Sequence, residues 1–305
     1  MRVVTGSFQK TASTGTVNQD ITSAHEARLA LGVGESYGLL ILQANQRTAT
    51  GFTDASHGRC AIGAFDGTRQ WGTRHFYEDN VSGLNQTSFG RIAWNQVFDG
   101  DVASGTDIGE AVASFLADGF RLAWTNSSSA QIYFQYTVLI IEDGDAVNFR
   151  VDQFVINSGT GDRSYSGAGF TPKGYLIAAA NDNGSLVTGE NSGSVGISFG
   201  GSDGNNEFVV SAHMDNGTNA TRRSYRDDRV WQTNDTFDVA IVHDTLFEAK
   251  NAFTASSTAA DQNPWPEGYS GWFTVSNGFQ NASASVSGLP SVSASGIAVR
   301  GRHAA

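Results

Sequence analysis

Apolar residues occupy every second position in several segments of this chain, and this pattern limits the fold more than any other feature. In the segment 131–140 the alternate apolar residues would share one face of an extended strand: Ile132, Phe134, Tyr136, Val138 and Ile140. The segments 119–124 and 236–242 alternate in the same way, with Phe120, Leu122 and Trp124 in the first and Phe237, Val239 and Ile241 in the second. A period of two residues is typical of β-strands, so the sequence predicts an all-β fold.

Turn-forming residues separate these segments. The chain contains 36 glycines, and only 16% of its residues are charged, a composition that suits many short strands joined by turns. The dipeptide Asp118–Gly119 predicts a hairpin turn ahead of the strand 120–124. Residues 107–116 are the one helical candidate, because their apolar residues fit helical spacing. The same residues can form a strand that enters the hairpin, and we favour the strand.

An internal repeat is the second constraint. Short motifs of the first half recur in the same order, at nearly constant spacing, in the second half: 6–8 with 152–154, 38–45 with 174–181, 62–65 with 195–198, 78–80 with 214–216, 91–94 with 229–231, and 119–125 with 268–274. A shared order of this kind indicates duplication of one structural unit. We therefore predict a tandem pair of jelly-roll-like β-sandwich domains, residues 1–147 and 148–305, the second with an insertion near 247–269.

Residues Gly34–Gly38 match the G-x-S-x-G pattern that presents the nucleophilic serine of many hydrolases. That turn needs a strand before the serine and a helix after it, whereas Ser36 precedes a strand-like run. The second copy has Pro172 where the first has Ser36. The sequence therefore predicts a polar turn before a buried strand, and no enzyme. A glycoside-active enzyme would need two carboxylates about 5–10 Å apart, and no pair of acids in the sequence stands out for it.

The sequence predicts no metal site and no cofactor. Cys60 is the only cysteine, and no two histidines stand at metal-ligand spacing. The acidic groups at 99–101 and 142–145 could bind Ca²⁺, but they lack the ligand periodicity of a calcium loop, and we interpret them as solvated turns. The repeated Asp-Asn pairs at 79–80 and 215–216 are interpreted as tight turns, with a pair of equivalent ligand sites as the alternative.

The charge distribution limits the partners. A net charge of −11 without a basic stripe argues against nucleic acid. No apolar run is long enough to span a membrane, and the first residues lack the apolar core of a signal peptide, so we expect synthesis in the cytoplasm. An extracellular working life stays compatible with that origin, because proteins can also leave a cell by lysis.

The segment 263–272 is the strongest candidate for a binding surface. Trp265 stands between two prolines, which predicts a stiff loop, and Tyr269 and Trp272 follow closely. Aromatic faces of this kind, beside Asn and Asp, could stack on sugar rings. The alternative is structural: Trp272 would lie in a core, as Trp124 would in the first copy, and Trp265 would pack at an interface between subunits.

Three segments carry a resemblance to a known class of protein: residues 174–181, 211–231 and 118–126. They resemble a repeated β-sandwich unit of virion-associated proteins, either head decoration or fibre proteins, of tailed bacteriophages and gene-transfer agents. The resemblance covers both halves and supplies no catalytic residue. It implies a structural protein displayed on the virion surface.

Two hypotheses about function follow from this resemblance. The first is a capsid decoration protein that contacts other virion proteins and forms a homo-oligomer, with a trimer favoured. The alternative is a head or tail fibre adhesin that binds host-surface glycans.

Overall fold

The computed structural model describes residues 1–45, 57–78, 88–102, 106–156, 161–166, 168–170, 172–181, 191–192, 195–203, 206–214, 221–226, 231–234, 240–247, 252–257 and 268–276. Within these residues the one helical element is a single-turn 3₁₀ helix, η1 (Ala27–Leu29). Every pairing between strands in the same part of the chain is antiparallel. The prediction of an all-β protein is confirmed.

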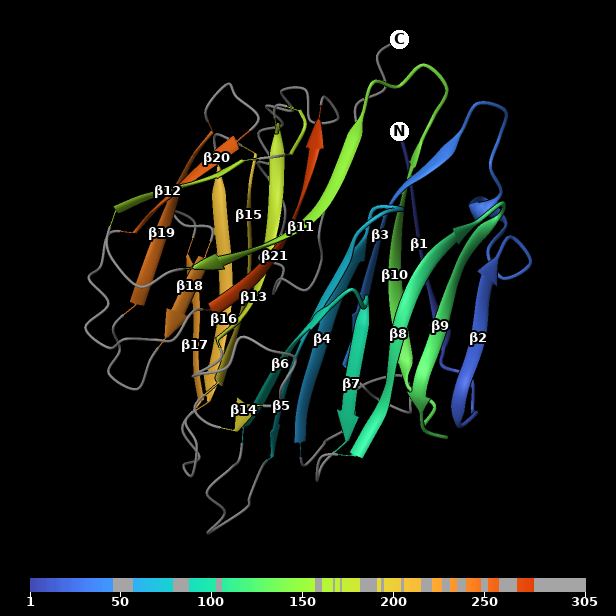
Figure 1. Ribbon diagram of the computed structural model, residues 1–305, viewed down its shortest axis with the longest axis horizontal. Helices are drawn as coiled ribbons and strands as arrows, with labels where there is room; N and C mark the ends of the chain where they lie inside the picture. The colour runs from blue at the N-terminus through green and yellow to red at the C-terminus, as the bar shows by residue number, and fades with distance from the viewer. Residues whose placement is uncertain are drawn as a thin grey trace, which may run out of the picture.

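The first half of the chain builds two sheets, here called the first inner sheet and the first outer sheet (Figure 1). The first inner sheet has the strand order β1 (Arg2–Gln9), β10 (Tyr133–Ile141), β3 (Ser36–Ala44), β4 (His57–Phe65), β5 (Gln70–Glu78), β6 (Ser88–Trp94) and β14 (Asn191–Ser192). The first outer sheet has the order β2 (Gly15–Thr22), β9 (Gly119–Ser127), β8 (Thr106–Leu116) and β7 (Phe98–Val102). Strand β14 comes from the second half, so one short segment of that half extends a sheet of the first.

The second half builds two further sheets. The second inner sheet has the order β11 (Asn148–Ile156), β21 (Gly268–Ser276), β13 (Gly174–Asn181), β15 (Val195–Ser202), β16 (Glu207–Met214) and β17 (Thr221–Arg226). The second outer sheet has the order β12 (Gly161–Ser166), β20 (Ala252–Ser257), β19 (Ala240–Phe247) and β18 (Trp231–Asn234). Figure 1 shows the four sheets as successive layers, with the two inner sheets in the middle.

The two pairs of sheets share one strand order. Apart from β14, each position of the first inner and outer sheets is matched by a strand of the second half in the same chain order. In each half the first two strands pair with the last two, β1 with β10 and β2 with β9 in the first half, and β11 with β21 and β12 with β20 in the second. The strands between them instead run as consecutive hairpins, β3 to β6 in the inner sheet and β7 to β9 in the outer sheet.

The core of the first half lies between its inner and outer sheets. The five alternate residues of 132–140 are all buried in one cluster with Phe120, Leu122 and Trp124 from β9, as their alternation predicts. The opposite face of β10 is not solvated throughout, because Leu139 is buried in a second cluster. That cluster joins the two inner sheets, with Leu39, Ile41 and Trp71 from the first, and Val151 and Ala178 from the second.

A hydrogen bond supports this packing of one half on the other. The carboxylate of Asp66, in the turn between β4 and β5, accepts from the backbone N–H of Val151 on β11 at 2.7 Å. The first inner sheet therefore carries buried residues on both faces, and an apolar layer joins the two halves in addition to the chain.

The first outer sheet confirms the preferred interpretation of residues 107–116. They form strand β8, which pairs with β9 across a two-residue hairpin, Ala117–Asp118, with Gly119 as the first residue of β9. A Cβ atom at Gly119 would lie 2.1 Å from the carbonyl oxygen of Ile21 on β2. Close packing of β9 against its neighbour therefore requires this glycine.

Two glycines let a backbone segment approach the first inner sheet. Gly63 on β4 and Gly72 on β5 are direct cross-strand partners. A Cβ atom at Gly63 would lie 1.7 Å from the carbonyl oxygen of Val97, and one at Gly72 would lie 3.0 Å from the same atom. The pair leaves space into which the backbone of Val97, just before β7, fits.

The core contains a fully buried lysine. Lys10 follows β1 and is 0% exposed. Its Nζ donates to the carbonyl oxygens of Ser128 at 2.6 Å and of Thr11 and Ala130 at 3.4 Å, and lies 5.3 Å from the ring centroid of Trp124. Burial lowers the pKa of Lys10. The ammonium group satisfies backbone acceptors that water cannot reach.

We expect Lys10 to resist acylation in the folded protein. Lys173 is exposed, whereas Lys10 can react only after local opening of the structure. Acetylation of Lys10 by an N-hydroxysuccinimide ester is therefore predicted to be slower than that of Lys173 by on the order of a hundredfold. Peptide mass spectrometry after timed labelling measures both rates, and labelling in denaturant is the control that should equalise them. Equal rates in the native protein would contradict this burial.

The sheets correct two of the sequence matches between the halves. Residues 119–125 form β9 in an outer sheet, whereas 268–274 lie in β21, which takes the place of β10 in an inner sheet. Trp94 ends β6, whereas Trp231 begins β18, which takes the place of β7. The sequence matches join strands that are not equivalent because the aromatic and glycine content of these strands is similar. Alternation alone does not identify the neighbouring strand.

The predicted insertion near 247–269 is corrected for the same reason. Strand β20 lies within it and pairs with β12 and β19, as β9 pairs with β2 and β8. Most of the apparent insertion arose because the sequence matches passed over one strand.

The hairpins β4–β5 and β15–β16 define the true register of the repeat. Asp66 and Asp203 open the two turns, and each carboxylate accepts a backbone N–H three residues later. Measured from these turns, Tyr175 occupies the place of Leu40, because Phe65 pairs with Leu40 and Ser202 pairs with Tyr175. The sequence match of 38–45 with 174–181 is therefore out of register by one residue, which exchanges the two faces of a strand. A register shift in the β3–β10 pairing, next to Gly38, accounts for the extra residue.

Candidate functional site

The structure describes two of the three aromatic residues that the sequence proposes as a binding surface. Trp265 lies outside the described residues. Tyr269 and Trp272 belong to β21, an interior strand of the second inner sheet between β11 and β13. The two positions are three apart, and positions an odd number apart belong to opposite faces of a sheet. Because β21 takes the place of β10 in the strand order, Trp272 does not occupy the position of Trp124. A glycan or interface contact at Trp265, Tyr269 and Trp272 stays a prediction.

Ser36 occupies the place that a polar turn residue should have. It is exposed and is the first residue of β3, with a turn before it and a strand after it. The order of strand, serine and helix that a nucleophile elbow needs is absent at this position. The prediction of a turn that enters a strand is confirmed.

The two acidic groups that were interpreted as solvated turns differ from each other. Residues 142–145 do form a turn, in which Asp145 N–H donates to the carbonyl of Glu142 at 3.0 Å. Asp99 is instead a strand residue of β7 and is buried against Arg74, with 3.3 Å between Nη1 and Oδ1. The prediction failed for Asp99 because its charge is compensated by a residue 25 positions earlier on another sheet. The Asp-Asn pairs at 79–80 and 215–216 lie outside the described residues.

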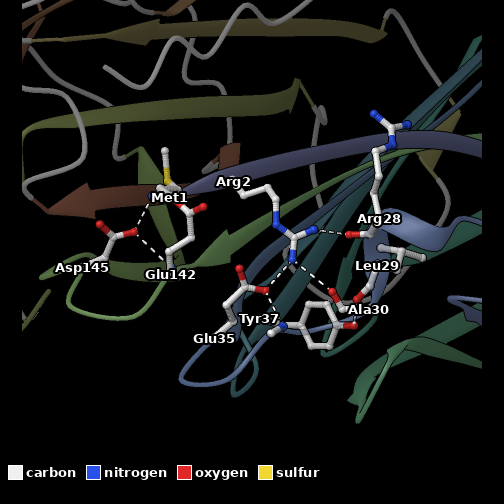
Figure 2. A network of polar contacts seen from close by, with 10 residues as sticks. Met1, Arg2, Arg28, Leu29, Ala30, Glu35, Tyr37, Glu142 and Asp145 are labelled. Carbon is white, nitrogen blue, oxygen red and sulfur yellow. Dashed lines mark hydrogen bonds and ion pairs between the residues drawn. The ribbon is translucent and has the colours of Figure 1, made fainter. Parts of the chain in front are cut away.

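Figure 2 shows a polar network that includes Arg2 and Glu35. Glu35 closes a turn formed by Gly32, Val33, Gly34 and Glu35, here called the Val33 turn. The N–H of Glu35 donates to the carbonyl of Gly32 at 3.3 Å, and Gly34 has a φ of +79°. A positive φ at the third position is typical of a type II turn, which explains the glycine there. The turn leaves Val33 99% exposed at its tip.

The Glu35 carboxylate and the Arg2 guanidinium stabilise the Val33 turn. Glu35 Oε2 accepts from the N–H of Gly32 at 2.7 Å and from Nη2 of Arg2 at 2.5 Å. These bonds lower the pKa of Glu35, the Gly32 bond being the larger cause. Arg2 also donates to the carbonyls of Arg28 and Ala30, so it links β1 to the end of η1 as well as to the Val33 turn (Figure 2).

The 3₁₀ helix η1 anchors the same loop in the core. Leu29 is fully buried, and its carbonyl accepts from the hydroxyl of Tyr37 at 2.5 Å. Glu26 caps the helix by accepting from the N–H of Arg28, and Arg28 in turn donates to the carbonyl of Thr5 on β1. The loop is therefore attached to two strands of the first inner sheet.

A second turn lies against the first. Glu142–Asp145 connects β10 to β11 and is closed by Asp145, whose carboxylate accepts from the N–H of Glu142 at 3.1 Å. The amine of Met1 forms ion pairs with Glu142 and Asp145 (Figure 2). A Cβ atom at Gly34 would lie 2.7 Å from the Asp143 side chain, which shows how closely the two turns pack. The Val33 turn thus lies beside the connection between the two halves.

Tyr37 gives this region a dependence on pH. Burial, with a smaller contribution from Asp118, raises the pKa of Tyr37 to about 12 from an ordinary value of 10.0. Above pH 10 the unfolded chain loses the phenolic proton while the folded chain keeps it, so the stabilising contribution falls as the pH rises towards 12. We expect Tyr37→Phe to reduce the loss of stability between these pH values. Urea unfolding at pH 8, 10 and 11.5 measures this, and equal pH dependence in both proteins would contradict it.

Within the described residues, no group of three or more His, Cys, Asp or Glu side chains could hold a metal ion. No helix in that part of the chain is long and apolar enough to cross a membrane. Comparisons of the chain with protein-family models, with curated proteins and with solved structures find no match.

Proposed function

We propose that this chain is a structural protein of a tailed-phage-like virion, made in the host cytoplasm and displayed on the particle surface as a capsid decoration protein. The observation that carries the proposal is the repeated strand order, combined with the apolar packing of one inner sheet on the other. This construction gives a thick, rigid β-sheet body, which suits a protein that stays fixed on a particle. The sequence resemblance to virion-associated repeats points the same way.

The proposal includes the domain organisation. The halves 1–147 and 148–305 are two copies of one β-sandwich unit, jelly-roll-like in the pairing of its outermost strands. Their partners are other virion proteins and further copies of this chain, with a trimer as the favoured oligomer because closed symmetric assemblies are the usual form. Neither an enzymatic reaction nor a cofactor is part of this function.

Immunogold labelling of purified particles from the source culture tests the location. The antibody is raised against the folded full-length protein and first shown to bind it in solution, and pre-immune antibody is the control. Gold over the head is the expected result. Gold on the tail or on projecting fibres would replace decoration by the adhesin alternative and make a glycan array the next measurement. Particles without gold would overturn the virion assignment.

A further inference from the structure

Val33 is an exposed apolar residue in an unusual setting. Single exposed valines are ordinary on protein surfaces and need no explanation. Val33 differs because it stands at the tip of a turn between two glycines, so no neighbouring side chain shields it, and the turn is closed by the contacts of Glu35 and Arg2. Because Glu35 and Arg2 hold the backbone of the turn, little backbone entropy is lost when a partner covers Val33.

Comparison of the two copies shows that this turn is an addition to the repeated unit. In the first copy, residues 23–35 connect β2 to β3; in the second, residues 167–173 connect the matching strands β12 and β13. The first connection is six residues longer, 13 against 7, and it contains η1 and the Val33 turn. The second copy forms the same strand order without them, so the strand order alone does not require a projecting turn.

The surroundings of Val33 are acidic. Asp143 is exposed in the neighbouring turn and touches Gly34, and Glu35, Glu142 and Asp145 lie close by, partly neutralised by Arg2 and Met1. The same turn on a second copy of this chain carries the same carboxylates, so two Val33 turns would repel each other. A surface with an apolar depression bordered by basic groups complements both the valine and the carboxylates.

We propose that the Val33 turn is a docking element that inserts Val33 into an apolar pocket with a basic rim on another protein of the particle. The proposal rests on the proposed function, because it takes the capsid surface as the partner. Asp143 supplies the charged part of the contact, and the position of the turn beside the connection between the halves lets one partner contact both.

Binding of the full-length protein to stripped particles tests this. Purified particles are stripped of the endogenous protein with a chaotrope, checked by immunoblot, and sedimented with increasing amounts of wild type or variant. Val33→Ser is expected to bind about tenfold more weakly, as the loss of one buried valine implies. Val112→Ser is the matched control, because Val112 is the other large apolar side chain exposed in the described residues, at 37%, and it should bind as wild type does. Equal melting temperatures show that each variant is folded.

Charge is tested separately. Asp143→Asn is expected to weaken binding about two- to threefold at low salt and to make binding less dependent on salt. If the wild type binds and Val33→Ser binds with the same affinity, the docking proposal is overturned and the proposed function stands. Wild type that does not bind at all would overturn the proposed function itself. Self-association of the wild type that Val33→Ser abolishes, measured by light scattering, would assign the turn to a second copy and overturn the capsid partner.

Discussion

Gly63→Ala is expected to destabilise the protein by about 3 kcal/mol, in the upper range for overpacking. A new Cβ atom would lie 1.7 Å from the carbonyl oxygen of Val97, which is a backbone atom and cannot rotate away. Either β4 or the segment that leads into β7 has to move, and both belong to the core of the first half. Thermal unfolding should show a loss of about 5 °C in the melting temperature, because the entropy of unfolding scales with chain length.

Gly67→Ala in the same hairpin is the matched control. Gly67 has a φ of +91°, so alanine there is strained, but the nearest atoms to its Cβ are those of the Phe115 ring at 3.6 Å, an ordinary contact. The cost should be only the conformational one, about 1 kcal/mol. Gly72→Ala, with 3.0 Å to the same carbonyl oxygen, should fall between them. If Gly63→Ala is no worse than Gly67→Ala, the close approach of Val97 is wrong.

Alternation in the sequence predicted the faces of strands well and their neighbours poorly. The pattern around Phe134 and Tyr136 identifies which residues enter the core, because a strand buried on one face must alternate. The same pattern cannot say which strand lies alongside, since pairing is made by backbone groups that every residue has. For this reason β9 and β21 were matched with each other although they lie in different kinds of sheet.

The candidate site was less predictable because its contacts are not local. The sequence of Gly32 to Glu35 indicates a turn, but the turn is also bound by Arg2, which lies 33 positions before Glu35. The aromatic residues around Trp265 are close in sequence, yet pairing with β11 and β13 determines where Tyr269 and Trp272 lie. Proximity in sequence predicts a shared surface only in a loop.

Removing one partner of the Arg74–Asp99 pair is expected to cost about 3–5 kcal/mol. Both side chains are only 2% exposed, and the pair joins β5 of the first inner sheet to β7 of the first outer sheet. Asp99→Ala leaves a guanidinium charge in a place that water cannot reach, and the lost attraction adds to that cost. The double variant Arg74→Met/Asp99→Leu should recover most of the stability, because apolar residues of similar size need no solvation. A double-mutant cycle by urea unfolding measures the coupling.

The exposed pair Asp20–Arg121 provides the control for this cycle. Its closest distance is 2.7 Å, shorter than the 3.3 Å of the buried pair, but its side chains are 39% and 38% exposed. Because water solvates whichever charge remains, Asp20→Ala should cost less than about 1 kcal/mol. A distance-based view predicts the opposite order, with the shorter pair costing more. If Asp99→Ala reduces stability as little as Asp20→Ala does, water reaches Arg74. The space between β7 and the first inner sheet would then be more open than their packing implies.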